Sequence, residues 1–275
     1  MKKFLALLIA VFLVFAVAGC SPNTSGKLAK IQEKGTLVVY TSPDFPPFEY
    51  TSGGNVVGVD ADLAAEIAKE LGVTIEWKSA DFEGICASIA SGRGDIAISG
   101  MTITEKRKKS VDFSNPYFDS AQYLILREDS DIATFEDLAG KKVGVAKGYT
   151  GSFVLDNEMN GSKDDKGNKV AGILEGKNTV KTTYNNAAES VLDLKKAGGL
   201  DAVIMDKYVA EKLKAQNDGI KVIPLVKADG SDAAEQYGVV VAKGNKDLLE
   251  IINRVVDRLV DEDKINEWRI NHEGQ

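Results

Sequence analysis

The sequence predicts an α/β protein of two lobes joined by two extended segments. From residue 35 onward, strand-like and helix-like segments alternate, which is typical of a mostly parallel sheet covered by helices. The same alternation starts again near residue 140. Two extended apolar runs, at residues 121–129 and 234–244, lie where the chain would cross to the second lobe and return. Two crossings leave a cleft between the lobes, and clefts at domain interfaces are favoured ligand sites.

The start of the chain has the features of a targeting segment and is set aside from the fold. Two lysines precede an apolar run at residues 4–15, which is too short to span a membrane. Small residues then lead to Cys20, an order that resembles the bacterial lipoprotein signal, in which the cysteine is acylated. An ordinary secretory signal or a short anchor is the alternative. We expect a signal peptide at residues 1–19 and a lipid-anchored tether at residues 20–34.

The first lobe begins with a βαβαβ pattern. In "GVDADLAAEIAKELG", Leu63, Ile67 and Leu71 recur at helical spacing, and Gly72 stands where a glycine commonly ends a helix. Hydrophobic runs on either side have the composition of strands. The expected elements are strands at residues 36–41, 73–78 and 95–100 and helices at residues 58–72 and 82–92.

The second lobe repeats this order. Residues 141–159 predict a strand, a glycine-rich turn and a helix, and residues 189–206 predict a helix, two glycines and a strand. A C-terminal helix at residues 246–269 carries an apolar stripe, and the return of the chain places it on the first lobe. The expected boundaries are residues 35–118 and 239–275 for lobe 1, residues 121–234 for lobe 2, and a hinge near residues 117–121 and 234–240.

Composition excludes several classes of function. The formal net charge is −7 and the pI is about 5.0, whereas binding to nucleic acid relies on many Lys/Arg–phosphate contacts. His272 is the single histidine, so a Ser-His-Asp or Cys-His catalytic site is not expected. No Cys/His cluster predicts a metal site, and we expect no cofactor. If Cys20 carries lipid, Cys86 has no cysteine left for a disulfide.

A run of four cations at residues 106–109 raises three alternatives: a nucleic-acid patch, a solvated helix face, or one cation that meets a small anion. The acidic chain argues against the first. Arg107 lies three residues after Thr104, a plausible N-cap, so its side chain can fold back toward the preceding strand. A guanidinium matches the geometry of a carboxylate with two parallel donors. Arg107 is therefore the candidate for anion binding.

Five segments together resemble the extracellular solute-binding proteins of amino-acid ABC transporters, family 3, over about residues 35–270. They are "YTSPDFPPFEY", "GVDADLAAEIAKELG", "DFEGICASIASGRGDIAISGMTITEKRKKSVDFSNPYF", "KKVGVAKGYTGS" and "EQYGVVVAKG". The resemblance implies a two-lobed periplasmic-binding-protein-like (type II) fold with a two-strand hinge. It also implies closure over a free amino acid and delivery to permease subunits. With the lipid anchor, we expect a monomer on the outer face of the cytoplasmic membrane.

The resemblance also implies how lobe 1 binds the ligand. Arg107 would bind the carboxylate. Gly100 and Thr102 follow the strand at residues 95–99, at the carboxyl end where open α/β sheets bind ligands. In the family, the matching positions supply a backbone carbonyl and a hydroxyl for the ammonium and a backbone N–H for the carboxylate. The simpler interpretation of Gly100 is that it only permits the turn.

Lobe 2 is expected to add contacts from two segments. Thr150 and Gly151 match the family's contacts at the start of a helix, where free N–H groups suit a carboxylate. Asp206 follows a strand and matches the ammonium-binding carboxylate, although it could also cap the next helix.

The aromatic positions and one departure bear on specificity. Phe45 and Phe82 match the rings that sandwich the ligand's side chain, and the Pro-rich turn around Phe45 favours its exposure to the cleft. Ser42 stands where several relatives for cationic or amide ligands carry an aspartate. Asp44 or Glu49 could substitute for it, but the departure favours a polar or sulfur-containing neutral amino acid.

Two rival functions share this fold. A dehydratase-like enzyme would use a pocket carboxylate, Glu49 or Glu83, as general acid. A ligand-sensing module would need a second hydrophobic span or a signalling domain, which the pattern does not predict. We expect a binding protein and not an enzyme.

Overall fold

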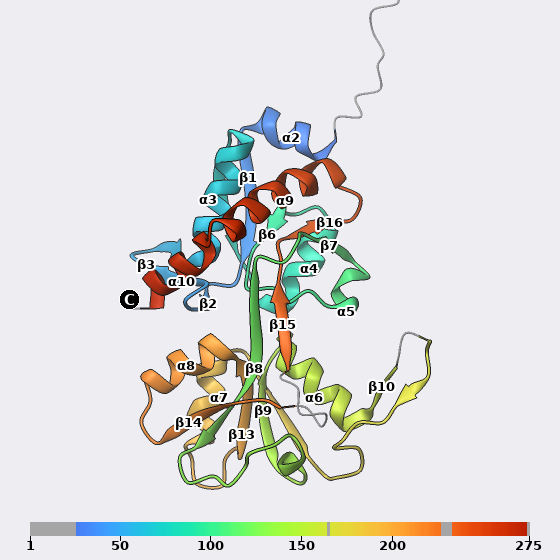
Figure 1. Ribbon diagram of the computed structural model, residues 1–275, viewed down its shortest axis with the longest axis vertical. Helices are drawn as coiled ribbons and strands as arrows, with labels where there is room; N and C mark the ends of the chain where they lie inside the picture. The colour runs from blue at the N-terminus through green and yellow to red at the C-terminus, as the bar shows by residue number, and fades with distance from the viewer. Residues whose placement is uncertain (1–25, 164–165, 227–232, 274–275) are drawn as a thin grey trace, which may run out of the picture.

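The computed structural model describes residues 26–163, 166–226 and 233–273, and the fold divides into an upper and a lower half (Figure 1). The expected signal peptide and Cys20 lie outside the described residues. Within the described residues, no helix combines the length and the apolar character needed to cross a membrane.

The upper half is built on a five-stranded sheet in the order β5-β1-β6-β16-β7. β1 pairs in parallel with β5 and β6, which confirms the expected βαβαβ unit, whereas β16 runs antiparallel to β6 and β7. The sheet is therefore mixed. Its strands are β1 (Thr36–Thr41), β5 (Thr74–Ser79), β6 (Ile96–Ala97), β7 (Val111–Phe113) and β16 (Val240–Ala242).

Helices cover both faces of the upper sheet, and the alternation of side chains along the strands decides which residues meet them. Val241 belongs to the core that contains α3 (Val59–Leu71) and α9 (Lys246–Asp261), whereas Val240 packs with α4 (Phe82–Ala90). The remaining elements of this half are β2 (Asp44–Phe45), β3 (Glu49–Ser52), β4 (Asn55–Val57), α5 (Glu105–Lys108) and α10 (Lys264–Glu273).

The expected tether needs a correction. Residues Lys27–Lys34 form helix α2, which contacts β1 and α9. Ile31 is buried in the upper core, Lys27 pairs with Asp95 at 2.5 Å, and Gly35 ends the helix in the left-handed conformation at φ 70°. The polar composition of this segment predicts a linker, but the buried side chain of Ile31, with Leu28 packed against the same core, places a short helix on the lobe.

The lower half is built on a second mixed sheet, in the order β12-β9-β13-β8-β14, with β15 also paired to β8. β12, β9 and β13 run parallel, and β8 runs antiparallel to β13 and β14. The strands are β8 (Phe118–Arg127), β9 (Lys142–Ala146), β12 (Val180–Tyr184), β13 (Ala202–Asp206), β14 (Ile220–Pro224) and β15 (Ala234–Tyr237).

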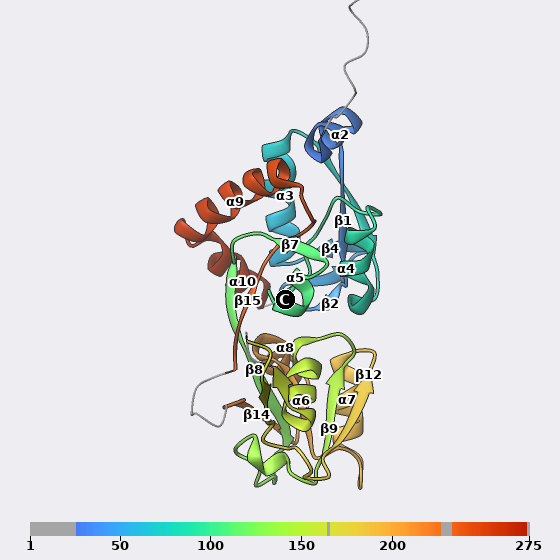
Figure 2. The same cartoon turned by 90° about the vertical axis from the view of Figure 1, so that its right-hand side faces the viewer.

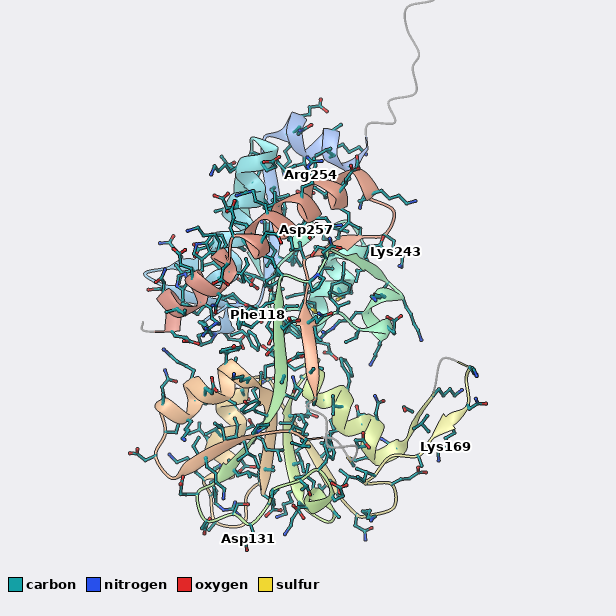
Figure 3. All side chains as sticks on the ribbon, in the orientation of Figure 1. Phe118, Asp131, Lys169, Lys243, Arg254 and Asp257 are labelled. Carbon is teal, nitrogen blue, oxygen red and sulfur yellow. The ribbon has the colours of Figure 1, made fainter. Side chains whose placement is uncertain are left out.

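One helix packs on one face of this lower sheet and two on the other. Leu155 of α6 (Thr150–Asn160) shares a core with Val143 and Val145, whereas α7 (Ala187–Leu194) and α8 (Lys207–Ala215) pack on the opposite face. A 3-10 turn and a small hairpin complete the half, and Lys169 marks the hairpin in Figure 3. These elements are η1 (Glu136–Leu138), β10 (Ser162–Lys163) and β11 (Lys169–Val170).

Strands β8 and β15 connect the two halves. Residues 118–121 of β8 pair with β15, and residues 122–127 pair with β13 and β14. Phe118 lies between the halves on β8 (Figure 3). In Figure 2 the two strands run along one side of the molecule, and α5 and β2 of the upper half face α6 and α8 of the lower half. The molecule is a two-lobed α/β protein.

Candidate functional site

Arg107 is buried between the lobes, although it belongs to a strongly basic run. The Oγ1 atom of Thr104 accepts a hydrogen bond from the backbone N–H of Arg107 at 3.2 Å, as the expected N-cap requires. Nη1 of Arg107 donates to the carbonyl of Thr102 at 2.7 Å, and Nη2 donates to the carbonyl of Gly148 in the other lobe at 3.0 Å. Burial lowers the pKa of Arg107, and nearby acidic groups oppose that shift. The guanidinium thus holds a desolvated positive charge at the lobe interface.

Threonines from the two lobes meet beside this arginine. Oγ1 of Thr150 donates to Oγ1 of Thr102 at 2.7 Å, and Oγ1 of Thr102 donates to Oε2 of Glu235 at 2.7 Å. Gly151 follows at the start of α6, where an added Cβ would lie 2.7 Å from Cγ2 of Ile204. The helix N-terminus therefore approaches β13 more closely than a side chain would permit.

Position 100 requires a glycine for two reasons. Its φ of 48° is in the left-handed region, and an added Cβ would lie 2.6 Å from the ring of Phe45. Its N–H donates to Oδ2 of Asp60 at 2.7 Å. That N–H is already bonded, so Gly100 can offer a ligand its carbonyl.

Asp206 lies at the end of β13, where it is 3% exposed. Its side chain makes no capping hydrogen bond to α8, so the simple N-cap interpretation is not realised. Nε2 of Gln122 donates to Asp206 and, at 2.9 Å, to Oε1 of Glu235. Burial, followed by the negative charge of Glu235, raises the pKa of Asp206 well above its usual value.

The aromatic side chains are arranged differently from expectation. Phe45 is 2% exposed and does not open to the cleft, because the rings of Phe48, Tyr149 and Tyr237 surround it. Tyr149 of the lower half stacks on Phe82 with centroids 4.3 Å apart and lies 5.8 Å from Phe45. Tyr149 thus contacts both Phe45 and Phe82, the two rings that were expected to hold the ligand's side chain.

Ser42 and its neighbours put a carboxylate at the other end of the site. Oγ of Ser42 donates to Oδ1 of Asp44 at 3.1 Å, and the hydroxyl of Tyr149 donates to the same oxygen at 3.4 Å. Burial raises the pKa of Asp44. Asp44 therefore stands two residues from the position where the aspartate is missing.

Glu49 has a structural place behind the site. It is fully buried, and its Oε1 accepts from Oγ of Ser99 at 2.7 Å, while Oγ of Ser99 accepts from the backbone N–H of Ser42 at 3.0 Å. Burial and then the charge of Asp60 raise the pKa of Glu49 well above its usual value. Glu49 supports the loops that carry Ser42 and Gly100.

Of the cavities lined by residues of both halves, the two that border Phe82 have volumes of about 530 Å³ and 320 Å³. Phe82, Glu83 and Lys147 line both, and Nζ of Lys147 pairs with Glu83 across the lobes at 2.8 Å. The larger cavity is also lined by Cys86, Met101, Lys106, Arg107, Ser110, Gly148, Ser152, Phe153, Asp156 and Thr183. The smaller one is also lined by Ser42, Asp44, Asp81, Gly84, Asn185 and Asn186.

Sequence reasoning missed Glu235, Gln122 and Tyr149. Glu235 and Gln122 are polar residues inside the two extended apolar runs, and a half-apolar strand ordinarily turns such residues to solvent. Here both side chains are buried, and Gln122 on β8 donates a hydrogen bond to Glu235 on the paired strand β15. The sequence signal that could have indicated their role was their position within the two extended segments that connect the lobes.

The family model for bacterial extracellular solute-binding proteins, family 3, matches residues 37–271. The chain belongs to this family. The arginine-binding extracellular protein ArtP of Bacillus subtilis (strain 168) is 31% identical, covering 98% of this chain and 97% of ArtP. The L-cystine-binding protein TcyJ of Escherichia coli (strain K12) is 31% identical, covering 90% and 88%.

Among solved structures, the chain resembles the amino-acid ABC transporter substrate-binding protein AbpA of Streptococcus pneumoniae Canada MDR_19A, bound to L-arginine. The identity is 30%, the TM-score is 0.76, and the match covers 89% of this chain and 97% of that one. These relatives are binding proteins and not enzymes. The chain is therefore an extracellular amino-acid-binding protein of the ABC transporter class, and nothing supports the dehydratase alternative.

Proposed function

We propose that this protein binds a cationic L-amino acid, with L-arginine as the preferred ligand, by closing its lobes about a hinge near residues 117–121 and 234–240. The observation that carries the proposal is the burial of a guanidinium, Arg107, and a carboxylate, Asp206, in one interlobe network. Opposite charges held apart in this way match the two charged ends of an α-amino acid.

The two ends of the ligand would be divided between the lobes. Arg107 binds the α-carboxylate, in place of its present bonds to backbone carbonyls, and the N–H groups at Thr150 and Gly151 face the same group. Asp206 binds the α-ammonium together with the carbonyl of Gly100 and the hydroxyl of Thr102.

The smaller cavity would take the ligand's side chain. Asp44, Asp81 and Glu83 line it, while Lys147, the one cation among the described residues that line it, is paired with Glu83. A positive side chain would pair with this acidic surplus and would oppose the effect of burial on the pKa of Asp44. Aromatic faces suit a guanidinium as well, and Phe82 contributes one to this cavity.

The preference for a cationic ligand differs from the neutral amino acid that Ser42 favoured. That expectation depended on a missing carboxylate, and Asp44 places one within hydrogen-bond distance of Ser42. The arginine-binding ArtP and the L-arginine complex of AbpA favour arginine, whereas TcyJ is named for cystine.

A ligand screen tests the proposal directly. We expect L-arginine, among the twenty amino acids and cystine, to raise the melting temperature most, because a ligand that binds only the native state stabilises it by mass action. Calorimetry then ranks the affinities. A larger shift with cystine, glutamine or another neutral amino acid would overturn the preference for a cation.

We also infer that acylated Cys20 anchors the protein on the outer face of the cytoplasmic membrane, where it serves permease subunits as a monomer. Because Lys27–Lys34 form α2, which packs on the upper half, the expected tether would be limited to residues 20–26, and α2 itself lies at the end of the upper half away from the lower half (Figure 1). Incorporation of labelled fatty acid should occur in the native chain and be lost in Cys20→Ser.

A further inference from the structure

Glu235 lies at the junction of the two lobes and of the two connecting strands. It is 6% exposed, on β15. Its Oε2 accepts from the hydroxyl of Thr102 in the upper half, and its Oε1 accepts from Nε2 of Gln122 on β8. A carboxylate that deep is costly unless it is paired, and the two groups that donate hydrogen bonds to it here, Thr102 and Gln122, are neutral. Glu235 therefore stands in a place suited to a positive group.

Gln122 links Glu235 to Asp206 and has an unused acceptor. Its Nε2 donates to both carboxyl groups, whereas its Oε1 accepts no hydrogen bond from any described residue, although the side chain is buried. A buried acceptor without a donor is destabilising. An ammonium group has three N–H donors, which Asp206, Glu235 and Oε1 of Gln122 would share with the carbonyl of Gly100 and the hydroxyl of Thr102 in lobe 1.

The two carboxyl groups cannot both be ionised cheaply in this environment. Burial comes first and the charge of Glu235 second in raising the pKa of Asp206, while Arg107 opposes them. Two phenols also face the pair, Tyr149 from the start of α6 and Tyr237 from β15, and both remain neutral because burial raises their pKa values. Like charges that share a buried site commonly retain one proton between them.

We propose that Glu235 and Gln122 complete the ammonium site with Asp206, and that the ligand's ammonium replaces a proton that Asp206 otherwise holds. This inference rests on the proposed function only in that an α-amino acid occupies the cleft. Glu235 is then a ligand-binding residue, and uptake of the amino acid is coupled to the release of a proton.

The direction of the pH effect follows from the exchange. The proton is held by the free protein and lost on binding, so affinity rises with pH by up to about tenfold per pH unit and levels off once the free protein is deprotonated. At acidic pH the proton competes with the ligand. An acidic surrounding would therefore favour release of the amino acid.

The test is calorimetry of L-arginine binding in phosphate and in Tris, which differ in ionisation enthalpy, from about pH 5 to about pH 9. The native protein is compared with Glu235→Gln and with Glu211→Gln, an exposed change on α8. We expect the native protein and Glu211→Gln to release a proton on binding within this pH range. Glu235→Gln should bind more weakly and release fewer protons, because burial still raises the pKa of Asp206 but the like charge beside it is gone.

A ligand-free measurement separates this inference from the choice of ligand. Carbon-13 NMR of the side-chain carboxyl groups should place the titration of Asp206 well above that of exposed aspartates, and Glu235→Gln should move it down. If L-arginine fails to bind, the calorimetry is repeated with L-glutamine, which has the same α-ammonium; that result would count against the ligand and not against the exchange. Proton release that is absent in the native protein, or unchanged in Glu235→Gln, would overturn the proposal, as would a normal titration of Asp206.

Discussion

At the scale of single residues, Arg107 shows how burial gives one cation of a basic run its own role. Arg107 is 7% exposed, whereas the three lysines around it are exposed. We expect Arg107→Ala to weaken L-arginine binding by about 2–5 kcal/mol, because the ligand's carboxylate would then be buried without its partner. Isothermal calorimetry measures this. Lys109→Ala is the control and should change the affinity little, and equal affinities for the two variants would remove Arg107 from the site.

Asp44 is expected to decide the preference for a cationic side chain. Asp44→Asn keeps the shape of the cavity and removes one charge, so L-arginine should bind about 1–3 kcal/mol more weakly, while L-glutamine should be much less affected. Competition between the two ligands in one titration gives the ratio. A ratio that does not change would show that the ligand's side chain lies elsewhere.

The residues of the site were predictable where a local pattern determines their role. Arg107 could be inferred because Thr104 caps its turn and a guanidinium matches a carboxylate. Glu235 could not, since its role depends on the pairing of β15 with β8, and strand pairing over more than a hundred residues leaves no local mark. Phe45 illustrates the same limit, because its burial comes from rings on other elements.

At the scale of elements, helix α2 is expected to stabilise the upper half. Ile31 is 1% exposed, so Ile31→Ala should lower the free energy of unfolding by about 2–5 kcal/mol. Urea denaturation followed by circular dichroism measures the change. Leu192→Ala, at a side chain that is 62% exposed on α7, serves as the control and should change stability by no more than about 0.5 kcal/mol. An Ile31→Ala midpoint equal to that of the native protein would mean that α2 frays freely.

The start of α6 offers a second test, with a matched pair of glycines. An added Cβ at Gly151 would lie 2.7 Å from Ile204 and 2.8 Å from Oε1 of Gln122, whereas one at Gly84 would meet no described atom within 4 Å. Gly151→Ala should therefore cost about 1–3 kcal/mol of stability. Gly84→Ala should be neutral or stabilising by up to about 1 kcal/mol, since alanine favours the helix. Thermal unfolding compares them, and the opposite order would contradict the close packing of α6 on β13.

The elements that sequence reasoning recovered are those with a strong period or a glycine stop. β1, α3 and α9 carry regular apolar positions, and Gly72 ends α3 in the left-handed conformation at φ 70°. Helix α2 has the same kind of ending at Gly35, but with one buried residue its pattern is too weak to separate from a polar linker. The sequence also carries no local signal for the direction of β16 and β8. The prediction of mostly parallel sheets therefore missed that both sheets contain antiparallel strands.

At the scale of the whole molecule, closure should depend on the contacts that lobe 2 makes with the ligand. A ligand shifts an equilibrium between open and closed forms only by its difference in affinity for the two. Lobe 1 contacts exist in both forms, whereas Asp206 reaches the ammonium only when the lobes are together. L-arginine should therefore bring the lobes closer in the native protein, and Asp206→Asn should lose most of that closure even at ligand concentrations that saturate its weaker site.

Distance measurements between spin labels can detect this motion, in a chain whose Cys20 and Cys86 are both replaced by serine. One label at Lys243→Cys in the upper half and one at Asp131→Cys in the lower half report on the lobes (Figure 3). A second pair, Lys243→Cys with Arg254→Cys, lies within the upper half and should keep its distance whether or not L-arginine is present. We expect L-arginine to shorten the first distance and Asp206→Asn to leave it long. If the variant closes as fully as the native protein, then lobe 2 contacts other than the ammonium site, such as those at Thr150 and Gly151, must supply the difference in affinity that drives closure.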